Sequence, residues 1–130
     1  MQKILTIEGD SITDIPSFYA QINAIFMQGE DWVLANSLDA LDDLFYGGYG
    51  TLKGEKCVTL IWKNIETSRV TLGYEVTRAF YENKLQYPEK FNVKLINQQL
   101  NDLKNGTGKT YFDIVLEIIA SHPNIEFSAQ

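Results

Sequence analysis

Residues 30–48 read EDWVLANSLDALDDLFYGG, and this stretch has the pattern of a loop, a short helix and a stop. Ser37 is a suitable N-cap, because its hydroxyl can accept a hydrogen bond from a free amide of the first helical turn. Gly47 can adopt the left-handed backbone conformation that ends many helices. The pattern therefore predicts a helix over 37–46, preceded by a loop that carries Trp32.

The predicted helix has one apolar face and one acidic face. Apolar positions recur at helical spacing and predict a buried stripe formed by Leu38, Leu41, Leu44 and Phe45. The opposite face, at positions i, i+3, i+4 and i+7, holds Asp39, Asp42, Asp43 and Tyr46. No basic residue stands beside these three carboxylates, and like charges at this spacing repel one another. Two interpretations stay open: a solvated acidic surface, or a surface that binds a cationic partner.

Acidic residues are concentrated in the first part of the chain. Eleven basic and 17 acidic residues leave a net charge of −6 for the whole sequence. Residues 1–52 hold one lysine and eight acidic residues, a net charge of −7, whereas residues 53–130 carry a net charge of +1. Such a field repels nucleic acid and membrane surfaces and attracts a basic partner. We therefore expect no binding to nucleic acid or to membranes.

The length and composition predict one globular domain. A chain of 130 residues can bury a core, and its hydrophobic content of 45% is ordinary for a globular protein. No segment is long and apolar enough to cross a membrane, and the N-terminus lacks the pattern of a signal peptide. The single cysteine, Cys57, excludes an internal disulfide, which is typical of proteins in a reducing compartment. We therefore expect a cytoplasmic protein.

Strand and helix patterns alternate along the chain. Short apolar and β-branched runs predict strands at 3–8, 57–62 and 124–128. Apolar residues that recur every three or four positions predict helices at 15–27, 37–46, 68–85, 89–104 and 109–121. The third helix is expected to begin at Thr67 or Ser68, although Gly73 weakens its middle. This alternation favours an α/β fold with a parallel sheet.

Two motifs and one pair of acids suggest other functions. Residues 106–110, GTGKT, resemble the end of a phosphate-binding loop, but Leu103 stands where that pattern requires glycine. His122 has no second histidine and no cysteine pair to complete a zinc site. Asp39 and Asp43 could act as a paired acid and base, but an exposed helix face lacks the burial that such chemistry usually uses. We therefore expect no catalysis, no cofactor and no metal.

The motif on the acidic helix resembles one in a known family. Residues 38–43, LDALDD, are similar to the Leu-Asp-Ala-Leu-x-Asp segment of the barstar family of ribonuclease inhibitors. The order of elements is also similar: a strand, a helix, the acidic helix followed by glycine, a second strand ending in Trp62, and a last helix and strand. The resemblance covers roughly 1–65 and 108–128. The segment at about 66–107 is an insertion relative to that family.

The resemblance implies both a fold and a function. The fold is a barstar-like α/β domain over 1–130, with a three-stranded parallel sheet packed with helices. The function is inhibition of a basic extracellular ribonuclease, whose active site accepts carboxylates in place of RNA phosphates. By position, Asp43 is the central anchor, Asp39 its neighbour one turn earlier, and Glu117 a flanking acid on the last helix. Gly47 matches a glycine just after the inhibitory helix.

The chain departs from the family pattern around this helix. Barstars carry a Tyr-Tyr-Gly-x-Asn loop where residues 33–37 read VLANS, and Asp42 replaces a tryptophan. The aromatic contact would then come from Trp32, with a shift in register. We therefore expect a partner surface formed by Trp32, Asp39, Asp42, Asp43, Tyr46, Gly47 and Glu117. The alternatives are an immunity protein for a different basic toxin, and a barstar-like fold with an unrelated binding or scaffolding role.

Overall fold

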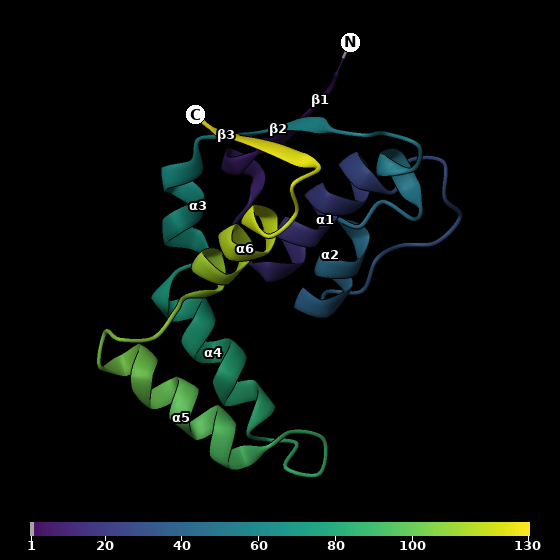
Figure 1. The fold of residues 1–130 in the computed structure, drawn as a ribbon. Coiled ribbons are helices and arrows are strands. Elements are labelled where there is room, and N and C mark those ends of the chain that lie inside the picture. Colours follow the sequence, from purple (N-terminus) through teal and green to yellow (C-terminus); the bar gives the residue numbers. More distant parts are fainter. Residues whose placement is uncertain (1) are drawn as a thin grey trace.

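A parallel sheet lies at one side of the protein in the computed structural model, which describes residues 2–130 (Figure 1). Within these residues three strands pair in the order β1 (Lys3–Glu8), β2 (Val58–Lys63), β3 (Ile125–Ala129). The helices are α1 (Ile15–Phe26), α2 (Leu38–Leu44), α3 (Ile65–Thr71), α4 (Tyr74–Lys84), α5 (Val93–Lys104) and α6 (Tyr111–Ala120). Two 3-10 turns, η1 (Gly9–Ser11) and η2 (Gly50–Leu52), follow β1 and α2. The predicted α/β class and three-stranded parallel sheet are confirmed.

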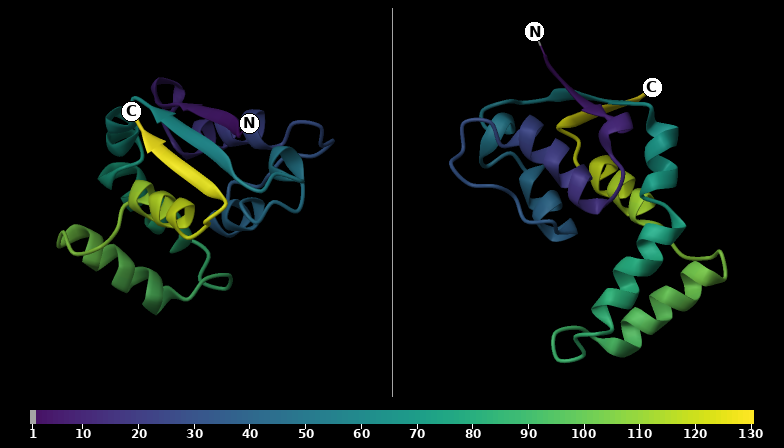
Figure 2. Two further views of the ribbon diagram at one scale, coloured as in Figure 1. Left: turned by 45° about the horizontal axis from the view of Figure 1, so that its top comes forward. Right: turned by 180° about the vertical axis from the view of Figure 1, so that it is seen from behind.

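The sheet is covered by helices on one face. Side chains alternate between the faces of a strand, so residues such as Leu5 and Leu60 point toward the helices and are buried. On the opposite face Ile4 is exposed and Ile61 is partly exposed. All the helices lie on one side of the sheet, as Figures 1 and 2 show from several directions. The domain therefore has two layers, whereas most parallel sheets are covered on both faces.

Trp62 joins the sheet to the helical layer. Its side chain is fully buried, with ring centroids 5.9 Å from Phe18 of α1 and 5.6 Å from Phe112 of α6. Its indole Nε1 donates a hydrogen bond of 3.0 Å to Ser68 Oγ in α3. Aromatic side chains bury large apolar areas, and a buried indole N–H needs an acceptor. One residue of β2 thus contacts three helices.

The predicted single helix over 68–85 is wrong, because two helices occupy this region. α3 begins before the predicted caps, directly after Asn64, whose φ angle is +52°. Ser68 is buried inside α3 and does not cap it. The helix is interrupted at Gly73, where a Cβ atom would lie only 2.7 Å from the carbonyl oxygen of Arg69. The absence of a side chain at Gly73 therefore permits the close turn between α3 and α4.

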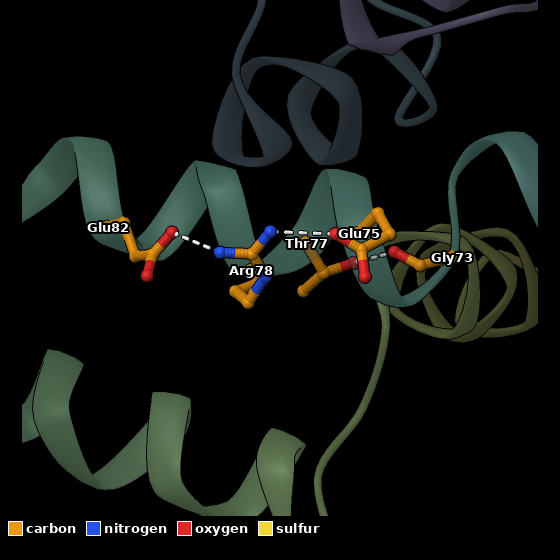
Figure 3. A network of polar contacts seen from close by, with 5 residues as sticks. All are labelled: Gly73, Glu75, Thr77, Arg78 and Glu82. Carbon is orange, nitrogen blue, oxygen red and sulfur yellow. Dashed lines mark hydrogen bonds and ion pairs between the residues drawn. The ribbon is translucent and has the colours of Figure 1, made fainter.

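The break between α3 and α4 supplies acceptors for the start of α6. The carbonyl of Leu72 accepts a 3.0 Å hydrogen bond from the amide of Phe112. Thr77 Oγ1 accepts a 2.7 Å hydrogen bond from the amide of Tyr111. The same hydroxyl donates a hydrogen bond of 2.7 Å to the carbonyl of Gly73, as Figure 3 shows. The first amides of a helix have no partner within it. The α3–α4 junction therefore anchors the N-terminus of α6.

Helices α4 and α5 form a hairpin that projects from the two-layer body (Figures 1 and 2). They pack on a small apolar cluster of their own, formed by Tyr81, Ile96, Leu100 and Leu103. On the surface of α4, Arg78 pairs with Glu75 at 2.7 Å and with Glu82 at 2.8 Å (Figure 3). α5 begins later than predicted, because Asn92 caps it by accepting from the amide of Leu95. This hairpin lies within the region expected to be an insertion.

Candidate functional site

Helix α2 has the caps that its sequence predicted. Ser37 Oγ accepts a hydrogen bond of 3.3 Å from the amide of Ala40. Gly47 has a φ angle of +85°, a conformation that side chains disfavour, and it follows the end of the helix. The helix is slightly shorter than the predicted range, 37–46.

The predicted apolar face of α2 packs into the core. Leu41, Leu44 and Phe45 are fully buried, and Leu38 is partly buried against the same cluster. On the opposite face Asp39 and Asp43 are exposed, as predicted. Asp42 is only partly exposed, which its contact with a distant residue explains.

Asp42 forms a close pair with a buried histidine. Its Oδ1 atom lies 2.7 Å from Nε2 of His122, whose residue is only 3% exposed. The His122 ring also contacts the rings of Phe45 and Tyr46, with centroids 5.7 and 4.6 Å apart. His122 lies in the segment between α6 and β3. Asp42 therefore has a partner from a distant part of the chain, and this contact ties α2 to the C-terminal segment.

Asp43 and Trp32 are connected by Tyr49. The Tyr49 hydroxyl donates a 2.9 Å hydrogen bond to Oδ2 of Asp43, and its ring centroid lies 5.0 Å from that of Trp32. Burial raises the pKa of Tyr49 to about 12, and the hydrogen bond to Asp43 adds to this effect. The hydroxyl therefore keeps its proton at neutral pH and donates the hydrogen bond to Asp43. Tyr49 is not among the predicted site residues, and its only signal in the sequence is that of an aromatic residue just after the two glycines that follow α2.

The loop before α2 is fastened at two points. The amide of Leu34 donates a hydrogen bond of 2.7 Å to Oδ1 of Asn23 in α1, and the Leu34 side chain is buried. The carboxylate of Glu30 accepts a 2.9 Å hydrogen bond from the amide of Gly50. Between these anchors the side chain of Trp32 remains about half exposed. The loop thus presents an aromatic side chain beside the acidic helix.

Asp39 lies at the edge of a cleft of about 600 Å³. Residues 36–39 form one wall of the cleft, and residues 80–91 of the α4–α5 hairpin form the other. Burial lowers the pKa of Lys84 in the second wall, while the negative charge of Asp39 opposes that lowering. Asp39 therefore has a cation of this chain, Lys84, within electrostatic range.

Glu117 is placed apart from the carboxylates of α2. It is exposed on α6, and its Oε1 atom lies 2.8 Å from Nζ of Lys109. In the described chain, residues 2–130, the hydrogen bonds and ion pairs of Glu117 connect it to neither Asp39 nor Asp43. The structure thus brings Asp43 together with Trp32, and Asp42 with Tyr46, but it gives Glu117 a separate lysine partner.

Asp43 differs from its neighbours because its side chain is contacted by a neutral hydroxyl and not by a histidine or a lysine. Asp42 pairs with His122, and Asp39 lies within range of Lys84. None of the ion pairs among residues 2–130 involves Asp43, whose hydrogen bond comes from a neutral hydroxyl. The carboxylate of Asp43 is thus exposed, held in one orientation and left with its charge uncompensated.

The other motifs of the sequence do not form a phosphate-binding loop or a metal site in the described residues, 2–130. The segment 106–110 follows helix α5, whereas a phosphate-binding loop follows a strand. Residues 2–130 contain no group of three or more side chains placed to hold a metal ion. No helix in the described part of the chain has both the length and the apolar character to span a membrane.

Comparison with known proteins gives no match, either to a protein-family model or to a curated protein. The local geometry around Asp43 is therefore the main guide to function.

Proposed function

We propose that this protein is a cytoplasmic, barstar-like inhibitor that blocks the active site of a basic ribonuclease with α2 and the loop before it. The observation that carries the proposal is the carboxylate of Asp43, which is exposed, oriented by Tyr49 and free of any cationic partner in residues 2–130. Such a carboxylate is a ready acceptor for the arginine, lysine and histidine side chains that hold RNA phosphates in a nuclease. Little reorganisation is needed before it binds.

Exposed aromatic side chains beside Asp43 support a protein partner. Trp32 is 46% exposed and Tyr46 is 72% exposed, on the loop and at the end of α2 respectively. Interfaces are enriched in tryptophan and tyrosine, which surround the central anchor and exclude water from it. We name Trp32, Asp39, Asp43 and Tyr46 the acidic surface. Asp42 is not part of the acidic surface but supports it from below, because its carboxylate already binds His122.

The order of elements supports the barstar-like assignment. The acidic helix α2 lies between the first two strands of a three-stranded parallel sheet, and the last helix leads into the third strand. This is the order that the motif over 38–43 implied. The α4–α5 hairpin is the added part in this proposal.

The uneven charge of the chain supports fast association with a basic partner. The net charge of −7 over residues 1–52 includes the whole acidic surface. Long-range attraction of this kind raises association rates and is screened over about 8 Å at physiological ionic strength. Binding is therefore expected to slow steeply as salt is added.

The test is a titration of ribonuclease activity on RNA, with purified barnase as the basic ribonuclease. Asp43→Ala is expected to weaken inhibition by about 30-fold or more, the loss typical of a central anchor residue. Asp42→Ala is expected to weaken it less, because its carboxylate is already engaged. Glu126→Ala, which removes an exposed acid from β3, is the matched control and is expected to leave inhibition unchanged.

Repeating the titration at low and high salt separates the long-range electrostatic attraction, which salt screens, from the direct contacts of Asp43. Equal dissociation constants for the wild type and Asp43→Ala would show that the proposed site is wrong. If neither barnase nor any basic ribonuclease from the producing cell is bound, a barstar-like fold with another partner becomes the better interpretation.

A second candidate function is binding or scaffolding through the α4–α5 hairpin. Its tip exposes the apolar side chains of Tyr87, Phe91 and Leu95. In this case binding of the partner would be lost in Leu95→Asp and retained in Asp43→Ala. A pull-down in which Leu95→Asp still binds the partner and Asp43→Ala does not would favour binding through the acidic surface.

A further inference from the structure

The cleft between α2 and the α4–α5 hairpin has the size of a small-molecule site. Its volume of about 600 Å³ lies within the range of about 300–1,000 Å³ that is common for ligand pockets. The walls come from segments 36–39 and 80–91, which are distant in sequence. Apart from Asp39, the residues of the cleft have no part in the proposed inhibition.

A fixed ammonium group lies in one wall of this cleft. Nζ of Lys84 is 4.2 Å from the ring centroid of Phe80 and 5.2 Å from that of Phe91. Cation–π attraction to two rings restricts where this charge can move. Lys84 is only partly buried, so an anion in the cleft can reach it.

A second cation and further aromatic surface border the same cleft. Lys90 is exposed, and its Nζ lies 5.5 Å from the ring centroid of Tyr87. The charged residues that line the cleft are these two lysines and one aspartate, Asp39, so their formal charges sum to +1. These lining charges favour an anion, although the cleft borders the acidic surface. The amides of Asn36 and Asn83 add neutral donors and acceptors.

We propose that this cleft binds a small amphipathic anion, namely a planar apolar ring that carries one carboxylate or phosphate group. The aromatic walls contact the ring, and Lys84 and Lys90 attract the anionic group. Ligand sites of this kind combine mostly apolar walls with a few polar groups that orient the ligand. A basic ligand is disfavoured, because it would meet two ammonium groups. This inference does not rest on the proposed inhibition.

Asp39 is expected to have opposite effects on the two activities. Its carboxylate competes with a bound anion for Lys84, so Asp39→Asn should tighten binding of the anion at least about threefold, because it removes a negative charge that repels the anion. The same change removes one acid from the acidic surface and should weaken inhibition of a basic ribonuclease. The two proposals can therefore fail separately.

The test is an NMR titration of the full chain with benzoate, phenyl phosphate and neutral benzyl alcohol. The chemical shifts of the backbone amides report binding. Shifts are expected at 36–39 and 80–91, and the better anion is expected to bind at least about fivefold more tightly than benzyl alcohol. Whichever anion binds more tightly identifies the group, carboxylate or phosphate. Lys90→Gln should weaken anion binding at least about fivefold, whereas Lys104→Gln, an exposed lysine at the end of α5, should not.

Three results would overturn the inference. One is the absence of shifts in the cleft at about 10 mM of either anion, a concentration at which ligands of this size occupy real pockets. Another is equal binding of benzyl alcohol and the anions. The last is unchanged binding in both Lys90→Gln and Lys84→Gln, with each variant folded as judged by its amide spectrum.

Discussion

Nε2 of His122 lies 2.7 Å from Oδ1 of Asp42, although the two residues are 80 positions apart in the sequence. The contact joins α2 to the segment that leads from α6 into β3. His122 is buried beside Phe45, so water does not readily replace Asp42 as its partner. The pair therefore helps to hold the acidic helix on the body of the protein.

Asp42→Ala is expected to lower the free energy of unfolding by about 1–3 kcal/mol, because it leaves a buried ring nitrogen of His122 without a partner. Repulsion among the carboxylates of α2, taken alone, would predict that Asp42→Asn changes stability little. Urea unfolding of the purified variant measures the difference. Asp39→Ala is the control and should stay within about 0.5 kcal/mol of the wild type, since its carboxylate is exposed. Equal stability of the two variants would contradict the role of the Asp42–His122 pair.

Leu41→Ala is expected to destabilise the protein by about 2–5 kcal/mol, because Leu41 is fully buried and the smaller side chain leaves a cavity. Val33 in the preceding loop is 74% exposed, and Val33→Ala should change stability by less than about 0.5 kcal/mol. Thermal and urea unfolding of both variants compare the two positions. A loss below about 1 kcal/mol for Leu41→Ala would argue against the buried face assigned to α2.

Gly73→Ala is expected to destabilise the protein by about 1–3 kcal/mol, because the new Cβ would lie against the carbonyl oxygen of Arg69 and force the backbone to move. Gly48→Ala is the matched control: no atom lies within 4 Å of its added Cβ, so stability should change by less than about 0.5 kcal/mol. Circular dichroism during urea unfolding measures both. A tolerated alanine at Gly73 would mean that the α3–α4 turn is not as close as described.

Stability is expected to fall in alkali because of two buried tyrosines. The hydroxyl oxygens of Tyr19 and Tyr111 lie 2.7 Å apart, and burial raises the pKa of both, that of Tyr111 to about 12. In the unfolded chain a tyrosine loses its proton near pH 10, before the folded chain does. The stabilisation is therefore fully present below about pH 10 and is lost as the pH rises toward about 12.

Urea unfolding at about pH 9, 10 and 11 measures this dependence. Tyr111→Phe should make the fall with pH shallower, whatever its effect on stability at neutral pH. A free energy of unfolding that stays constant across this range would contradict the raised pKa values.

Parts of the site that depend on neighbours in the sequence were predictable. The cap at Ser37, the stop at Gly47 and the burial of Leu41 follow from hydrogen bonds and periodicity within one or two helical turns. Alternating strand and helix patterns likewise predicted the parallel sheet. Gly73 was noted as a weak point of one long helix. The hydrogen bond from the amide of Phe112 to Leu72 beside this break was not predictable, because its donor comes from another element, α6.

The sequence by itself determined that this protein has a short acidic helix between two strands of a parallel sheet, with its leucines inward and its aspartates outward. Only the tertiary structure decided what each aspartate contacts: Asp42 binds His122, Asp43 binds Tyr49, and Asp39 borders a cleft with Lys84. Helical periodicity assigns a residue to a face because it depends on local geometry. The partner on that face comes from another element, and its position is set by how the whole core packs.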